Sequence, residues 1–194
     1  MGRSTVAPAP RSRRGREHIA PVRGRAARVV LLRHGPAELR DPARWPDDRD
    51  RPLSRKGTAQ TRRVARALVA LVGPAAFVAT GPAVRSRSTA TIVADRLTPG
   101  RAVVRWDELD VARRPEPILA RLGRELRRDR PVVLVGHDPV LGELLGLAVV
   151  GEGLAFARLS KAGAACLEFP ARVRPGAARL RWLLTRKQLA RKGA

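Results

Sequence analysis

The chain has 194 residues, of which 44% are hydrophobic, and its formal net charge at pH 7 is +23. This length can bury the core of one domain, and no stretch approaches the roughly 18 consecutive apolar residues that cross a membrane. The single cysteine, Cys166, excludes an internal disulfide and a cysteine-rich metal site. Because Cys166 lies in an apolar run, we expect a buried structural thiol. The low cysteine content is most simply that of a cytoplasmic protein.

The positive charge is concentrated toward the two ends of the chain. Residues 1–28 carry eight arginines and one glutamate, and residues 171–194 carry eight basic residues and no acid. Only four of the 40 basic residues are lysines, which indicates a coding bias toward arginine. The charge therefore does not favour nucleic acid as a partner, although a basic protein that binds nucleic acid or an anionic surface remains the alternative of another class.

Residues 1–27 are predicted to form a disordered basic leader, because they mix Pro, Arg, Ser, Gly and Ala without apolar periodicity. An organelle transit peptide has the same composition, whereas a secretory signal would need an apolar segment that is missing here. Translation could also begin further along the chain. His18 belongs to this leader and is expected to be solvated, and the folded domain is predicted to span residues 28–190.

The first strand is predicted over residues 29–32, four consecutive aliphatic residues that are followed by Arg33, His34 and Gly35. A polar loop over residues 36–52 comes next. Ser54 is a candidate N-cap for a helix that reaches about Val72, where Gly73-Pro74 stops it.

Two further strands are predicted over residues 76–80 and 102–106. The first leads into a helix that carries Arg85 and ends near residue 97. The second is followed by three carboxylates, Asp107, Glu108 and Asp110. An amphipathic helix over residues 115–129 follows.

A fourth apolar strand, residues 131–135, leads to Gly136 and His137. Asp138 is predicted to be the N-cap, and Pro139 the first residue, of a helix that reaches Val149. Residues 164–169 and 179–184 are expected to form an antiparallel pair that closes the sheet, with Trp182 in the core.

Ligands of parallel α/β sheets bind outside the carboxyl ends of the strands. Four side chains are predicted to lie at these strand ends. They are the only two histidines beyond the leader, His34 and His137, and the arginines Arg33 and Arg85. Arginine forks and imidazole donors in such a crevice suit a phosphoryl group.

Four segments resemble the histidine phosphatase superfamily, the phosphoglycerate mutase-like enzymes. These are the Arg33-His34-Gly35 triplet, residues 51–57 as R-P-L-[ST]-x-x-G, residues 81–90 as S-P-x-x-R-A-x-Q-T-A, and residues 135–139 as V-G-H-N-P. Gly81, Ser86, Ser88 and Asp138 depart from these patterns. The resemblance implies a three-layer α/β/α fold with a mainly parallel sheet, and the short chain and its ending are most similar to the compact SixA-type phosphohistidine phosphatases.

The resemblance also implies a role for each site residue. His34 would be the nucleophile, Arg33 and Arg85 would bind phosphate, and His137 would be the second catalytic and phosphate-binding histidine. Glu108 is the candidate proton donor, with Asp107 and Asp110 as rivals.

The predicted reaction is hydrolysis of a phosphomonoester or phosphoramidate through a phosphohistidine on His34, with no cofactor and no metal. The partner is expected to be a phosphorylated protein, a phosphohistidine domain, because the chain has little room for the insertions that build a sugar-phosphate pocket. A broad phosphatase of small phosphorylated substrates is the alternative. A mutase is not favoured because its longer lid has no counterpart, and an inactive relative is not favoured because both histidines and both arginines are present.

Overall fold

The computed structural model describes residues 26–110, 114–155 and 157–192. Nearly all of the predicted leader, including His18, lies outside the described residues. Among the helices that are described, none is long and apolar enough to cross a membrane.

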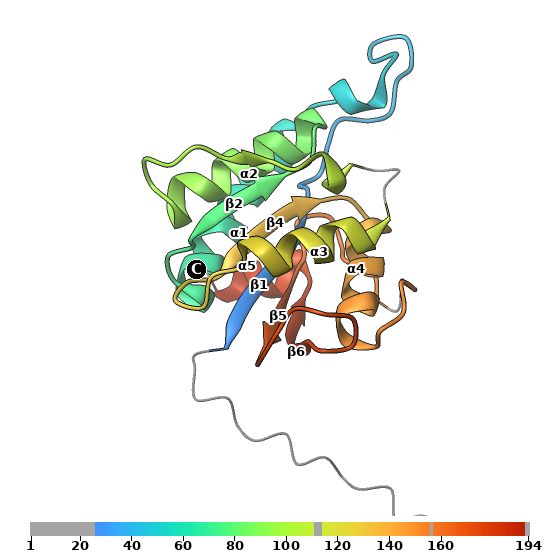
Figure 1. Cartoon of the computed structure of the whole chain (residues 1–194). Coiled ribbons are helices and arrows are strands. Elements are labelled where there is room, and N and C mark those ends of the chain that lie inside the picture. The colour runs from blue at the N-terminus through green and yellow to red at the C-terminus, as the bar shows by residue number, and fades with distance from the viewer. Residues whose placement is uncertain (1–25, 111–113, 156, 193–194) are drawn as a thin grey trace, which may run out of the picture.

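The described residues form a mixed sheet of six strands in the order β3-β2-β4-β1-β5-β6 (Figure 1). Strands β1 to β4 pair in parallel, and β5 and β6 add to the β1 edge in antiparallel fashion. The strands are β1 (Ala27–Arg33), β2 (Phe77–Thr80), β3 (Val104–Arg105), β4 (Val132–Gly136), β5 (Ala164–Phe169) and β6 (Arg179–Leu184). The predicted parallel sheet with an antiparallel closing pair is therefore confirmed.

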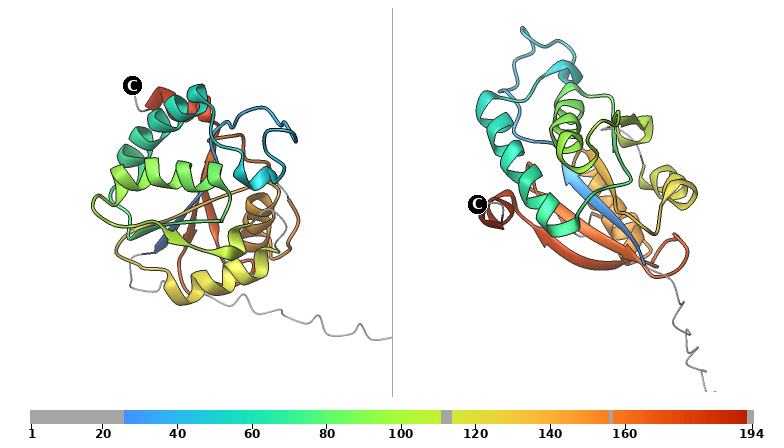
Figure 2. Two further views of the ribbon diagram at one scale, coloured as in Figure 1. Left: turned by 90° about the horizontal axis from the view of Figure 1, so that it is seen from above. Right: turned by 90° about the vertical axis from the view of Figure 1, so that its left-hand side faces the viewer.

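Helices cover both faces of this sheet, which confirms the predicted three-layer α/β/α architecture (Figure 2). One face is covered by α1 (Arg55–Val72), α2 (Val84–Leu97) and α5 (Arg186–Lys192), and the other by α3 (Pro115–Glu125) and α4 (Val140–Val149). Short 3-10 helices, η1 (Asp48–Asp50) and η2 (Asp107–Leu109), lie in the loops that follow β1 and β3.

The aliphatic run of β1 is buried because it contributes to both hydrophobic layers. Successive side chains of a strand point to opposite faces. Val29 and Leu31 accordingly belong to the α3/α4 layer, and Val30 and Leu32 to the α1/α2 layer. Fully buried aliphatic residues on both faces make β1 and its neighbour β4 the centre of the sheet, so the residues after these strands have well-defined positions.

Helix α1 begins and ends at the predicted signals. The Ser54 hydroxyl accepts a hydrogen bond from the Gly57 backbone N–H at 3.0 Å, as expected for an N-cap. The helix ends at Gly73, which has a positive φ of 72° that an L-residue with a side chain rarely adopts.

Two predicted elements are shorter in the structure. Strand β3 spans only two residues because it is an edge strand with two paired positions, and its extension at Trp106 is a single hydrogen bond to Thr80. Helix α3 ends at Glu125 instead of residue 129. The basic residues beyond it leave the helical pattern, and Arg128 donates to the carbonyls of Pro170 and Ala171 instead.

One prediction about local environment was wrong, and another holds in part. Asp138 is not a helix cap: its carboxylate accepts hydrogen bonds from Arg158 and the Leu159 backbone, and α4 begins one residue later, with Pro139 as its N-cap. Trp182 packs against the α1/α2 layer as predicted but is only half-buried, because β6 is an edge strand whose residues alternate toward solvent. Cys166, in contrast, is buried as predicted.

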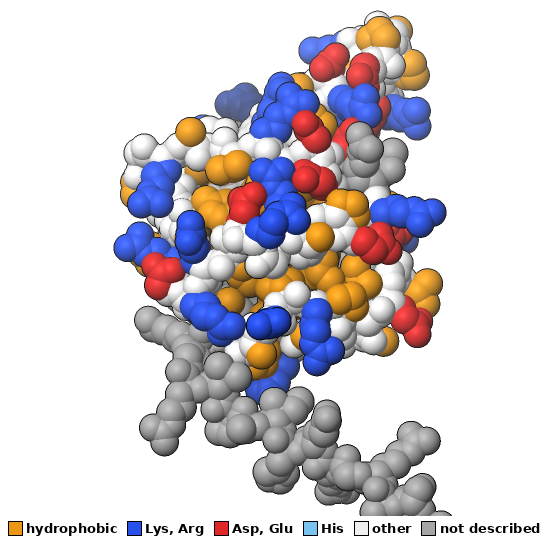
Figure 3. All heavy atoms as spheres, in the orientation of Figure 1, with side chains coloured by type: hydrophobic (Ala, Val, Ile, Leu, Met, Phe, Trp, Pro, Cys, Tyr) orange, Lys and Arg blue, Asp and Glu red, His pale blue; other side chains and the backbone are white. Residues whose placement is uncertain are grey.

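Basic side chains are spread over the face of the molecule in Figure 3 and do not form one continuous patch there. Acidic side chains are interspersed among them, especially on the loop that projects above the sheet. A single basic stripe, the usual footprint of a nucleic-acid site, is not a feature of this face.

Candidate active site

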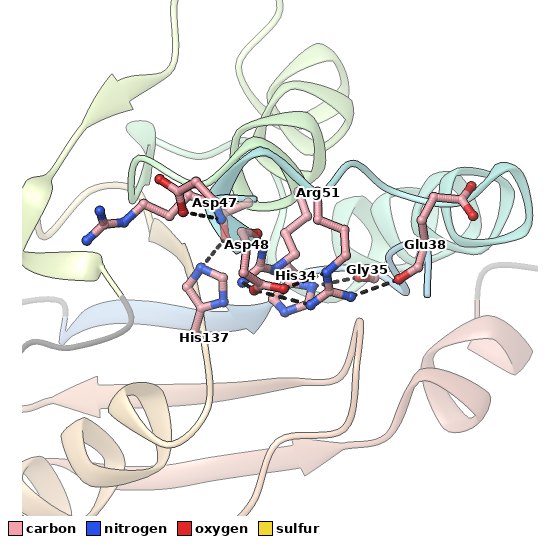
Figure 4. Close-up of polar contacts among 10 residues, drawn as sticks. His34, Gly35, Glu38, Asp47, Asp48, Arg51 and His137 are labelled. Carbon is pink, nitrogen blue, oxygen red and sulfur yellow. Dashed lines mark hydrogen bonds and ion pairs between the residues drawn. The ribbon is translucent and has the colours of Figure 1, made fainter. Parts of the chain in front are cut away.

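His34 and His137 follow the two central parallel strands, and the sheet brings them together. Arg33 is paired with Gly136 across β1 and β4, and the His34 backbone N–H donates to the Gly136 carbonyl at 3.0 Å. The two imidazole rings lie 4.8 Å apart between centroids, inclined by 58° (Figure 4). The predicted juxtaposition of the two histidines is therefore present in the structure.

The backbone after His34 is held by α2 and α1. The Gly35 N–H donates to the Thr89 hydroxyl at 3.0 Å, and that hydroxyl donates in turn to the Arg85 carbonyl at 2.7 Å. A Cβ on Gly35 would lie 2.2 Å from the Thr61 hydroxyl oxygen, so only glycine fits this close approach. The imidazole of His34 is thus attached to a well-defined turn.

The hydrogen bond of the His34 ring assigns its tautomer. Nδ1 lies 2.7 Å from the Gly35 carbonyl oxygen, which can only accept, so Nδ1 carries the proton and Nε2 keeps a free lone pair. Burial is the largest cause of a decrease in the pKa of His34 from 6.5 to about 3, to which the neighbouring His137, Arg85 and Arg33 contribute and which the hydrogen bond to Gly35 opposes. The ring is therefore neutral at pH 7, as a nucleophile must be.

His137 is also neutral. Burial lowers its pKa to about 4, with Arg85 adding to the decrease and Asp110 opposing it. Its Nε2 lies 3.1 Å from the Ser86 hydroxyl, which comes from the first turn of α2. Ser86 stands at a position where the sequence pattern has alanine, and its contact with His137 could not be read from that pattern.

Arg85, which is buried, and Arg33, whose side chain is 20% exposed, bring two guanidinium groups to the histidines. Arg33 donates to the Leu159 carbonyl at 2.7 Å and lies 3.7 Å from the Asp138 carboxylate. Arg85 donates to the backbone carbonyl of Asp48 and forms an ion pair of 2.9 Å with its carboxylate. The Nε of each arginine is buried without a hydrogen-bond partner. These two Nε–H groups are donors that the protein itself does not satisfy, so they are available to bind an anion.

The three candidate acids point in different directions. Glu108 forms an ion pair with Arg121 of α3 at 3.0 Å, and Asp107 forms one with Arg105 at 2.6 Å. Asp110 is 6% exposed, its charge acts on both His137 and Arg85, and it pairs with Arg49 at 2.8 Å. The structure thus directs Glu108 toward α3 and Asp110 toward the histidines.

Arg51 and Asp48 join the site from the loop after β1, and neither was predicted from the sequence to have a role. Arg51 donates to the Asp48 carboxylate at 2.8 Å and to the Glu38 carbonyl at 2.8 Å. The signal for Arg51 was its place in the R-P-L motif, but its direction toward the histidines depends on how the loop folds back.

The described residues contain no group of three or more His, Cys, Asp or Glu side chains that could hold a metal ion. The polar groups around His34 are mainly donors, the opposite of a cation site.

The two neutral histidines predict a specific pH dependence of stability. In the unfolded chain a histidine binds a proton near pH 6.5, whereas the folded site takes one up only near pH 3 to 4. Between these values the unfolded state binds more protons, so stability is complete above pH 6.5 and is lost as the pH falls. We expect the melting temperature to decrease from pH 7 to pH 4.5, and to decrease less steeply in His34→Gln. Parallel curves for the two proteins would contradict a neutral, buried His34.

An α/β sheet that brings a neutral, hydrogen-bonded histidine and two arginines together at the carboxyl ends of its parallel strands is typical of a phosphate-handling enzyme. The model of the histidine phosphatase superfamily (branch 1) matches residues 29–110, and the chain belongs to this superfamily. It is a hydrolase that acts on phosphate groups.

The chain is similar to three further proteins. An uncharacterized protein of a Picosynechococcus species is 37% identical over 154 residues, which cover 78% of this chain and 87% of that protein. The protein histidine phosphatase SixA, solved with tungstate, superposes with a TM-score of 0.72 at 22% identity, over 84% of this chain and 99% of SixA. A mycobacterial glucosyl-3-phosphoglycerate phosphatase superposes with a TM-score of 0.61 at 19% identity, over 83% of this chain and 100% of its own.

Proposed function

We propose that the chain is a SixA-type protein phosphohistidine phosphatase that works through a phosphohistidine intermediate on His34. The observation that carries this proposal is the tautomer of His34. Its Nδ1–H is used by Gly35, and its Nε2 lone pair is free beside buried guanidinium donors. This arrangement suits an in-line attack on phosphorus, where catalysis consists mainly of positioning and charge stabilisation.

In the proposed first step, Nε2 of His34 attacks the phosphorus atom, and the bond from phosphorus to the leaving group breaks. Arg33 and Arg85 neutralise the phosphoryl oxygens, and His137 donates a third hydrogen bond. The electron pair of the broken bond leaves with the leaving group, which takes a proton. Water then attacks the phosphohistidine, so inorganic phosphate is released and His34 returns to its neutral form.

The proton for the leaving group is expected to come from Asp110 in preference to Glu108. Each acid has an arginine partner, Arg49 for Asp110 and Arg121 for Glu108, but only Asp110 is buried with a charge that acts on His137. A protonated imidazole leaves readily, so an enzyme for phosphohistidine depends less on this acid than one for an alkyl phosphate ester.

The substrate class rests on the small size of the chain around the site. The segment between β2 and β4 consists of two helices, a two-residue strand and a 3-10 helix. Its described residues therefore contain no large insertion that could enclose a small molecule. The fold similarity to SixA supports a protein substrate, but a relative of the same fold is named for glucosyl-3-phosphoglycerate. A broad phosphatase of small molecules is therefore the second candidate.

Parallel assays separate these two functions. Phosphate release would be measured from a phosphohistidine protein and from p-nitrophenyl phosphate, with the same enzyme preparation. A much larger kcat/KM for the phosphohistidine protein is expected. Equal or higher efficiency with p-nitrophenyl phosphate and sugar phosphates would favour the broad small-molecule phosphatase instead.

A further inference from the structure

Three residues of the site are almost fully buried in this structure. His34 is 5% exposed, Arg85 4% and His137 3%, although a nucleophile for a phosphorylated substrate must be reached from outside. The cover on Arg85 is a carboxylate of the protein itself, that of Asp48 from η1. A substrate can therefore reach Arg85 only when Asp48 moves.

The contacts of Asp48 are those that a phosphoryl group would be expected to use. One carboxylate oxygen pairs with Arg85 at 2.9 Å, and the other accepts from Arg51 at 2.8 Å (Figure 4). Planar guanidinium forks bind carboxylates and phosphates with the same geometry. The hydrogen bond from Arg51 lowers the pKa of Asp48, so the carboxylate is ionised at neutral pH.

The segment that carries Asp48 is attached in a way that permits this movement. None of the residues 36–52 is buried, and η1 contributes nothing to the core. The base of the loop is held by the hydrogen bond from the Glu38 N–H to the Pro52 carbonyl at 3.0 Å. The tip is bound to the rest of the molecule through charged contacts, Asp48 with Arg85 and Arg49 with Asp110. In each pair the partner on the loop is the more exposed one, with 38% of the Asp48 side chain and 54% of the Arg49 side chain accessible, so both contacts can open toward solvent.

We infer that Asp48 is a built-in competitor that occupies the phosphate site until a more highly charged anion displaces it. The inference rests on the proposed phosphate site. A carboxylate and a phosphate cannot share the same two arginines, because like charges repel across so short a distance. An anion must therefore bind Arg85 and Arg51 better than Asp48 does, which a doubly charged phosphoryl group achieves and a single carboxylate does not. Asp48 thereby selects for phosphorylated ligands over ordinary carboxylates.

Asp48→Asn tests the inference directly, since asparagine keeps the shape and loses the charge. The control is Asp50→Asn, which removes the same charge from the same exposed turn, where no ion pair to Arg85 or Arg51 is formed. Binding of inorganic phosphate, tungstate and acetate to each full-length protein would be measured by calorimetry. We expect about tenfold tighter binding of phosphate and tungstate by Asp48→Asn, a change typical of about 1.4 kcal/mol, and unchanged binding by Asp50→Asn. Acetate binding should become measurable only in Asp48→Asn.

The outcomes distinguish this inference from the proposed function. Equal phosphate affinity in all three proteins would overturn the role of Asp48 and leave the phosphate site intact. Weaker binding by Asp48→Asn would also overturn it, since Asp48 would then serve to position the arginines. If no protein binds phosphate or tungstate while melting as a folded protein, the proposed phosphate site itself fails, and the inference fails with it. In steady-state assays the inference further requires a lower KM in Asp48→Asn, with a smaller change in kcat.

Discussion

Replacement of His34 by alanine is expected to lower phosphate release by at least about 10³-fold, because the proposed covalent intermediate cannot form without the nucleophile. What activity is left would come from binding and charge stabilisation by the remaining groups. The steady-state rate of phosphate release measures this loss. The two other histidines of the chain, His18 and His137, can be replaced by alanine in the same way, and the activities of the three variants compared.

The intermediate gives a second, independent measurement of the same step. With a ³²P-labelled substrate, the wild-type protein should acquire label that is lost in acid and kept in base, as a phosphoramidate requires. His34→Ala should acquire none. His137→Ala should turn over more slowly but still acquire label, because the Nε2 lone pair of His34 does not depend on it.

The control for the first prediction is His18→Ala, a histidine that lies outside the described residues and is expected to have no effect. Because His34 is buried against His137, the melting temperature of His34→Ala must be measured before its activity is interpreted. Label on a folded His34→Ala protein would show that another residue is the nucleophile.

The positions of His34 and His137 could be predicted from the sequence because they depend on a simple physical rule. An aliphatic run that is buried on both faces must lie in the middle of a parallel sheet. Two such runs, each followed by a histidine, then place both imidazoles at one edge, which is where the pairing of Arg33 with Gly136 puts them. Arg85 followed from the same rule, because α2 begins where β2 ends.

The acid could not be predicted in the same way, because the three carboxylates lie within four consecutive positions. Residues 107–109 form a 3-10 helix of about three residues per turn, so side chains two positions apart point in clearly different directions. The sequence did not show that this turn would direct Glu108 to Arg121 and Asp110 to His137.

The roles of Asp48 and Asp138 depend on long-range contacts that no local pattern encodes. Asp138 precedes a helix and is of a residue type that often serves as an N-cap. Its carboxylate instead accepts hydrogen bonds from Arg158 and the Leu159 backbone N–H, about 20 positions further along the chain. Asp48 lies in an acidic loop that the sequence describes only as polar. Its contact with Arg85 spans 37 positions and depends on how that loop folds over the site.

Arg85 connects this loop to the chemistry, and its replacement by lysine is expected to reduce kcat/KM by about 10²-fold or more. A guanidinium offers two parallel donors to two phosphoryl oxygens, whereas an ammonium is a single point charge at a different depth. The side chain is 4% exposed, so lysine cannot recover the lost contact by drawing on solvent. The effect should appear in kcat/KM for every phosphorylated substrate, since all of them present the same phosphoryl group.

Arg87→Lys is the matched control for Arg85→Lys, because Arg87 is exposed one half-turn further along α2 and should tolerate lysine with less than about twofold change. Wild-type kcat/KM in a folded Arg85→Lys protein would show that Arg85 is not part of the phosphate site.

The double variant Asp48→Asn/Arg85→Lys tests whether Asp48 acts through Arg85. If Asp48 acts by competing for Arg85, the tighter phosphate binding that Asp48→Asn gives in the wild type must shrink when Arg85 is lysine. Additive effects would mean that Asp48 influences the site by a route other than this guanidinium.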